Sequence, residues 1–204
     1  MMKKKTIVTF LLLSLTLMMM LPFGISAQAA GKKTKACKAY RKFLEKSNSD
    51  VMWGTAYLNN DTIPDLVTYT AFAPIGKPMV YTYRKNKVVK VSLSMANSYY
   101  SHYYKKKGVV LNVPVYKKDW PYDFKEYCTF NFKKTATARN NNVKAVCYQE
   151  DKKYYKPDQK SETGWTQIKK AEFSKLLKKK VGNAKPKKIK YYKNTAENRK
   201  KHLK

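Results

Sequence analysis

The chain has 204 residues, of which 44 are Lys or Arg and only 13 are Asp or Glu, and its formal net charge at pH 7 is +31. Because so many like charges repel one another, the composition predicts an anionic partner. Lysine far outnumbers arginine, which argues against recognition through bidentate guanidinium contacts. Two histidines and three cysteines, with no CxxC pair, argue against a zinc site.

An export signal is predicted at residues 1–29. Lys3–Lys5 precede an apolar run of mainly Leu and Met over Thr6–Phe23, and Ala27–Ala29 supplies the small residues at which a signal peptidase cuts. We expect cleavage after Ala29, no membrane span in the rest of the chain, and a secreted, extracellular protein that is free or held on the cell wall. The alternative is an uncleaved membrane anchor, because the apolar run is close to the shortest that crosses a bilayer.

Residues 30–184 are predicted to form one secreted α+β domain that begins and ends with a helix. Apolar residues at helical spacing predict a helix over Lys32–Leu44, with Cys37 inside its buried stripe. A second helix is predicted over Lys169–Val181, and Gly182 is placed to end it.

Between the two helices, segments of alternating apolar and polar residues predict strands that short polar turns connect. The predicted strands are Met52–Leu58, Asp65–Phe72, Met79–Tyr83, Val88–Leu93, Tyr99–Tyr104, Val109–Val115, Tyr127–Ala138, Val143–Tyr148 and Lys152–Lys156. Short turns between successive strands favour an antiparallel β-meander. We expect the N-terminal and C-terminal helices to cover its packed face, and lysines to coat the other face.

Cys128 and Cys147 both occupy positions that face the predicted core. Export allows disulfides to form, so a Cys128–Cys147 bridge is the best pairing among the three cysteines. Free thiols are the alternative, because the register of the two strands cannot be read from the sequence.

Residues 185–204 form a basic C-terminal segment. Asn194-Thr195-Ala196-Glu197 resembles a helix N-cap with Glu at the third helical position. The segment is either a strand and a helix that dock on the sheet, or a flexible tail. Its basic side chains are the predicted polyanion contacts: Lys187, Lys188, Lys190, Lys193, Arg199, Lys200 and Lys201.

The turn from Leu58 to Leu66 resembles the D-x-N-x-D-G-x-P-[DE]-L loop of secreted Gram-positive proteins, a calcium-loop-like turn between two strands. Asn59, Asp61 and Asp65 are the candidate calcium ligands, and no other cofactor is predicted. Tyr57 and Thr62 stand where that loop has its first Asp and its Gly. The alternative is a plain turn in which Asx side chains cap the backbone.

Two further stretches are similar to uncharacterised lysine- and tyrosine-rich secreted proteins of gut-type Gram-positive bacteria. They are the hairpin Tyr81–Val88 and the ending Lys187–Lys201. The resemblance implies an extracytoplasmic, β-rich fold and no particular activity.

The predicted function is therefore that of a basic binding or surface-associated module without catalytic residues. Its partners would be cell-wall polyanions or anionic glycans, attracted by lysines and contacted by tyrosines, with no sequence-specific nucleic-acid binding. The alternative is a small extracellular hydrolase that acts on glycans. Its acid pair would come from Asp119, Asp123 and Glu126 around Trp120.

Overall fold

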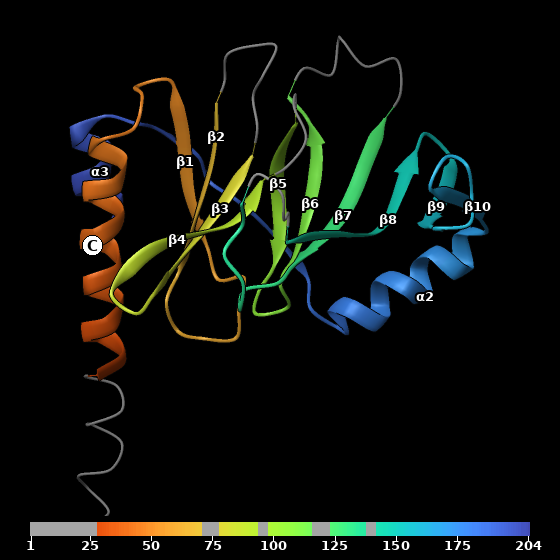
Figure 1. Cartoon of the computed structure of the whole chain (residues 1–204), viewed down its shortest axis with the longest axis horizontal. Coiled ribbons are helices and arrows are strands. Elements are labelled where there is room, and N and C mark those ends of the chain that lie inside the picture. Colours follow the sequence, from red (N-terminus) through yellow and green to blue (C-terminus); the bar gives the residue numbers. More distant parts are fainter. Residues whose placement is uncertain (1–27, 71–77, 94–97, 116–122, 138–141) are drawn as a thin grey trace, which may run out of the picture.

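The computed structural model describes residues 28–70, 78–93, 98–115, 123–137 and 142–204 (Figure 1). These residues form an α+β fold, mostly β, with two antiparallel sheets and three helices. None of the helices in these ranges has the length and apolar character that a membrane crossing requires. The predicted signal peptide lies outside the described residues except for its last two positions.

The first sheet follows the chain from strand to strand and gains one edge strand from the C-terminal segment, in the order β12-β1-β2-β3-β4. Its strands are β1 (Val51–Ala56), β2 (Asp65–Thr70), β3 (Met79–Arg84), β4 (Lys87–Leu93) and β12 (Tyr192–Lys193). Lys85 and Asn86 form the turn between β3 and β4 at φ of 49° and 60°, which matches the twist of a two-residue hairpin.

The second sheet has the order β10-β9-β8-β7-β6-β5-β11 and also takes an edge strand from the C-terminal segment. Its strands are β5 (Ser98–Tyr104), β6 (Val109–Pro114), β7 (Phe124–Phe130), β8 (Val143–Glu150), β9 (Lys153–Pro157), β10 (Trp165–Ile168) and β11 (Pro186–Lys188). The short strand β10 was not predicted from the sequence.

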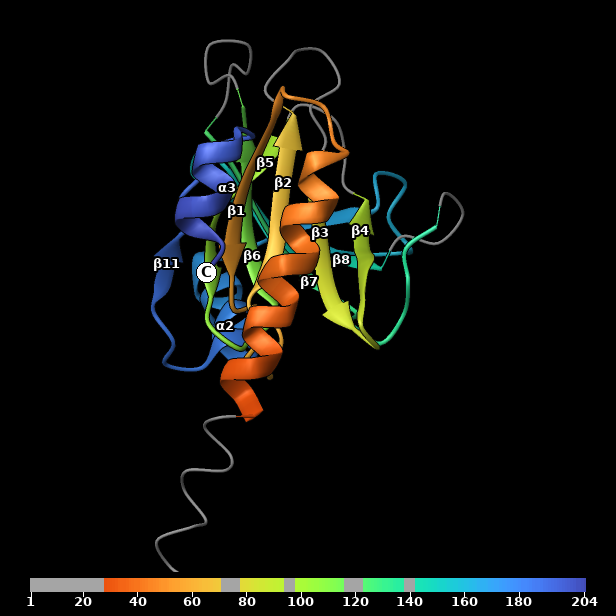
Figure 2. The ribbon, with the colours of Figure 1, turned by 90° about the vertical axis from the view of Figure 1, so that its left-hand side faces the viewer.

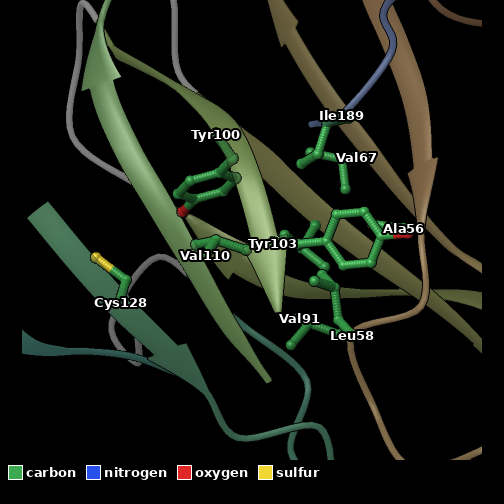
Figure 3. Packing of buried hydrophobic residues seen from close by; sticks show 10 residues of the cluster. Ala56, Leu58, Val67, Val91, Tyr100, Tyr103, Val110, Cys128 and Ile189 are labelled. Atoms are coloured by element: carbon green, nitrogen blue, oxygen red, sulfur yellow. The ribbon is translucent and has the colours of Figure 1, made fainter. Parts of the chain in front are cut away.

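The two sheets pack face to face around a buried core. The first sheet contributes Ala56, Val67, Val80 and Val91, and the second contributes Tyr100, Tyr103, Val110 and Cys128. Figure 3 shows the Tyr103 ring pointing from β5 towards Ala56 of β1. Burial of these apolar surfaces holds the sheets together, as in other sheet-on-sheet folds.

Helices cover the outer face of each sheet. Residues 28–45 form a helix over the first sheet (Figure 2), where Tyr40 and Leu44 share a buried cluster with Trp53. On the second sheet, Phe173 of α2 (Lys170–Val181) meets Tyr154, with ring centroids 4.9 Å apart. Both predicted helices are therefore present, but they lie on opposite sides of the fold instead of sharing one face.

The expected single meander is divided into two sheets. Strands β1 to β4 and β5 to β10 are each adjacent in chain order, so meander connectivity holds within each sheet. The inner face of each sheet packs against the other sheet and the outer faces carry helices, so the expected open, lysine-coated face is wrong for the first sheet. On the second sheet, α2 packs along β8 and β9, and its Leu177 and Val181 reach the cluster of Tyr104 and Val109 on β5 and β6.

The strand predicted over Tyr127–Ala138 is wrong in its second half. β7 ends at Phe130, and the chain then crosses to the first sheet, where the Ala136 N–H donates to the Lys90 carbonyl over 2.9 Å. The Arg84 guanidinium of β3 holds the crossing segment by donating to the Phe132 carbonyl over 2.7 Å. This segment therefore links the sheets instead of extending one of them.

The predicted Cys128–Cys147 disulfide is not formed, and all three cysteines are buried free thiols. A β-bulge between β7 and β8 places Cys147 opposite Tyr127, and Ala145 opposite Cys128. Cys128 therefore faces the core between the sheets, whereas Cys147 packs with Phe173 under α2. The prediction failed because a one-residue change of register turns a side chain to the other face of the sheet.

Candidate functional site

The C-terminal segment joins the edges of the two sheets. β11 pairs antiparallel with β5, with Lys188 opposite His102, and the Ile189 N–H donates to the Ser101 carbonyl over 2.9 Å. A few residues later, β12 pairs with β1, with Tyr192 opposite Trp53. Of the two forms that the sequence allowed for residues 185–204, the structure has the docked one.

Core contacts fix this segment at several points. Ile189 and Leu203 are 3% and 1% exposed, and the Tyr191 hydroxyl donates to the Tyr100 carbonyl over 2.8 Å. The terminal helix α3 (Ala196–His202) begins after Thr195, whose hydroxyl accepts from the Asn198 N–H. The segment is therefore packed into the domain and is not a free tail.

The predicted helix cap is correct in kind but displaced by one residue. Asn194 is buried, and its Nδ2 donates to the Leu44 carbonyl over 2.8 Å and to the Asn48 carbonyl over 3.2 Å. Asn194 thus serves the carboxyl end of the N-terminal helix and not the start of α3, where Thr195 is the cap. Side-chain donors at such an end satisfy carbonyls that lack partners within the helix.

A groove of about 610 Å³ lies where the segment passes from one sheet to the other. We call it the C-terminal groove, and it is lined by Tyr99, Ser101, His102, Lys188, Ile189, Lys190, Tyr191 and Tyr192. Lys188 and Lys190 are exposed, so both ammonium groups are available to solvent or to a ligand.

Aromatic rings pack closely around this groove. Tyr191 lies edge-on to Tyr69, with ring centroids 4.8 Å apart, and at 6.1 Å from Tyr99. The ring of Tyr192 stacks on His202 at 3.8 Å. Burial raises the pKa of Tyr191 well above its ordinary value, so its hydroxyl stays protonated as the donor to Tyr100. The groove therefore combines two exposed lysines with half-buried, closely packed rings.

The other predicted polyanion contacts do not all play one role. Lys187, Lys193, Lys200 and Lys201 are exposed along β11, β12 and α3. Arg199 is different, because its guanidinium donates to Asn194 Oδ1 over 2.9 Å and is half buried. Arg199 orients the buried Asn194, so its role in the structure is to hold the segment in place.

The lysines of the segment have no ion-pair partner among the residues that the structure describes. Within those residues the ion pairs are Lys125 with Asp123 and Lys156 with Glu172, both on the second sheet and its helix. The positive charge along the C-terminal segment is therefore not neutralised by described neighbours.

The three candidate calcium ligands serve the turn that contains them. Asp65 is 1% exposed, and one carboxylate oxygen accepts from the backbone N–H groups of Leu58 and Asn59 over 3.1 and 3.3 Å. Its other oxygen accepts from the Asn59 side-chain amide. Asp61 accepts from the Ile63 N–H over 2.8 Å. These bonds fit the alternative reading of a self-capped turn.

Burial sets the proton affinity of Asp65. It raises the pKa of this carboxyl to about 7, and the hydrogen bonds from Thr82, Asn59 and Leu58 oppose the rise. In the described part of the chain, no three His, Cys, Asp or Glu side chains gather as a metal site would require.

The acid pair of the hydrolase alternative is not assembled by its two described members. Asp119 lies outside the described residues. Asp123 is exposed and pairs with Lys125, whereas Glu126 accepts from Asn112 Nδ2 over 3.2 Å. Lys125 and Glu126 are neighbours on β7, so their side chains point to opposite faces, and Asp123 and Glu126 engage partners on different sides of the sheet.

Sequence reasoning missed the part of the groove that β5 contributes: Tyr99, Ser101 and His102. The pairing of β11 with β5 joins segments far apart in the chain, and no local sequence pattern predicts it.

Comparison of the chain with protein-family models, with curated proteins and with solved structures gives no match.

Proposed function

We propose that this protein is a secreted binding module that anionic polymers of the cell surface retain through the C-terminal groove and the exposed lysines of the same segment. The observation that supports the proposal is the combination, on one docked segment, of aromatic side chains with lysines that have no ion-pair partner among the described residues.

The chemistry of the groove suits a repeating anion that carries sugars. Lysine ammonium groups are strongly hydrated point charges, which attract phosphate or carboxylate groups without fixing one geometry. Half-buried tyrosine rings offer apolar contact at little entropy cost, because their neighbours already hold them. Binding would then depend on many weak contacts along a polymer and would weaken as salt screens the charges.

The same side chains favour binding over catalysis. Lys188 and Lys190 supply charge, but the groove's described lining holds no carboxylate for acid–base work on a glycosidic bond. We therefore propose attachment, rather than hydrolysis, as the role of this surface.

Isolated cell walls provide the test. The protein without residues 1–29 is mixed at low salt with walls in their native state and with walls from which the anionic polymers have been extracted. We expect sedimentation with native walls and release from extracted walls. Equal sedimentation with both preparations would contradict the proposal.

A further inference from the structure

A second cleft lies where connections of the two sheets meet, away from the C-terminal groove. The β5–β6 turn closes against the β1–β2 turn, because the Lys106 N–H donates to the Tyr57 carbonyl over 2.8 Å and the Gly108 N–H donates to the Leu58 carbonyl over 2.7 Å. The start of β8 and the segment after β7 complete the walls of a space of about 520 Å³. We call it the lysine–asparagine cleft.

Positive charge dominates the rim of this cleft. Lys106, Lys107, Lys133 and Lys144 line it, and all four are exposed. Its described lining contains no Asp or Glu, and neither ion pair of the described residues involves these lysines. The four ammonium groups are thus free to meet a ligand with more than one negative charge.

Side-chain amides form the second component of the cleft. Asn59, Asn60, Asn131 and Asn142 all line it. Asn142 is 6% exposed, its Nδ2 is covered from solvent, and no described group accepts a hydrogen bond from that atom. A buried amide donor without an acceptor is costly, so a turn of the Asn142 side chain towards the cleft would let a ligand oxygen accept a bond that the protein alone does not make.

Two aromatic rings form the apolar part of the lining. Phe130 and Phe132 contact each other edge to face, with ring centroids 5.9 Å apart, and both are half buried. Both rings pack against the buried core cluster that contains Leu58. A sugar ring presents C–H groups on one face and hydroxyls at its rim, which suits a lining that holds both aromatic rings and amides.

We propose that the lysine–asparagine cleft binds a sugar phosphate, with the phosphate held by the lysines and a sugar hydroxyl held by Asn142. Neither charge nor the aromatic rings alone require this ligand class, but the lining of the cleft brings together exposed cations, apolar rings and, just below the surface, an amide donor without a described acceptor. The proposal does not rest on the C-terminal groove, which has no lining residue in common with this cleft.

Nuclear magnetic resonance titration of the chain without residues 1–29 tests this site. Glucose 6-phosphate is added at about 150 mM salt, where weak surface attraction is screened, and glucose and inorganic phosphate are added in parallel. We expect glucose 6-phosphate to shift the backbone amide of Gly108 and the side-chain amide of Asn142, and to bind about tenfold or more tightly than either part alone.

Two variants separate the cleft from general charge. Lys106→Gln with Lys144→Gln removes two cations of the rim, and Asn142→Asp replaces the donor with a repelling carboxylate. Each should weaken glucose 6-phosphate binding by about tenfold, while Lys187→Gln with Lys188→Gln, outside the cleft, should leave it within about twofold. The amide spectrum of each variant reports whether it is folded.

Three results would overturn the assignment. They are the absence of any shift at the cleft, binding of glucose or of inorganic phosphate as tight as that of glucose 6-phosphate, and unchanged affinity in the folded Lys106→Gln and Lys144→Gln variant.

Discussion

Gly54 of β1 lies directly beneath the backbone of Lys190. A Cβ atom built on Gly54 would collide with the Lys190 carbonyl oxygen and approach Ile189 Cγ2 to 2.9 Å. The obstacle is backbone, which cannot rotate away as a flexible side chain does. The absence of a side chain at Gly54 therefore permits the crossing of the C-terminal segment from one sheet to the other.

Gly54→Ala is expected to destabilise the fold by about 1–3 kcal/mol, the cost of an added methyl group in a packed interior. It should also weaken attachment to cell walls, because Lys190 would be displaced. Urea unfolding measures the first effect. Gly31→Ala is the control, since nothing lies within 4 Å of a Cβ there. A Gly54→Ala protein as stable as the Gly31→Ala protein would contradict this account of the crossing.

Asn194→Ala is expected to lower the unfolding free energy by about 1–3 kcal/mol. The substitution leaves the buried Leu44 carbonyl without its donor and removes the acceptor of the Arg199 guanidinium. Thermal unfolding of the variant, compared with Asn183→Ala at an exposed position, measures the effect. If both variants melt together, Asn194 does not hold the C-terminal segment to the N-terminal helix.

Local patterns predicted most elements but not their arrangement. Helical spacing correctly predicted the N-terminal helix and α2, and alternation with polar turns predicted the hairpins, because these signals depend only on neighbouring residues. The division into two sheets depends on the crossings after Phe130 and at Lys190, which pair distant segments. Neither crossing produces a periodic pattern of apolar residues in the sequence.

The candidate site was predictable only in part. Lys188 and Lys190 were expected contacts, but Tyr99 and His102 reach the groove through long-range pairing. Arg199 was grouped with the lysines because the sequence shows its charge. The sequence does not show that its guanidinium donates to the buried Asn194 side chain. The predicted cysteine pairing was wrong for a related reason. A one-residue bulge between β7 and β8 determines that Cys128 and Cys147 lie on opposite faces of the sheet.

Stability should depend on pH through Asp65. Its folded pKa is raised from 3.8 to about 7, so the folded protein holds the proton more tightly than the unfolded chain. This contribution is complete below the unfolded pKa and is lost as pH rises through about 7. We expect the unfolding free energy to fall more steeply between acid and neutral pH in the wild type than in Asp65→Asn.

Urea unfolding at several pH values gives the two slopes. The comparison uses slopes and not absolute stabilities, because the asparagine also changes hydrogen bonds to Leu58 and Asn59. Parallel profiles for the two proteins would show that Asp65 does not titrate in this range.

Reducing agent should leave the melting temperature unchanged. Cys128 and Cys147 lie on opposite faces of the second sheet, and burial raises the pKa of Cys147 to about 12, which makes its thiol unreactive at neutral pH. A disulfide closing this loop would contribute about 3 kcal/mol. Two results together would contradict the structure. One is a clear drop in melting temperature on reduction, and the other is an unreduced protein about 2 Da lighter than the reduced one, the mass of the two hydrogens that a disulfide loses.

The most direct test of polyanion attachment compares two double variants of equal charge. Lys188→Gln with Lys190→Gln changes the C-terminal groove, and Lys178→Gln with Lys179→Gln changes exposed positions on α2. Both proteins are bound to cell walls and eluted with rising salt. If the groove makes the attachment, its variant elutes at clearly lower salt than the α2 variant, because local contacts are lost in addition to net charge. Elution of both variants at the same salt would mean that total charge alone holds the protein, and would contradict the groove as the binding site.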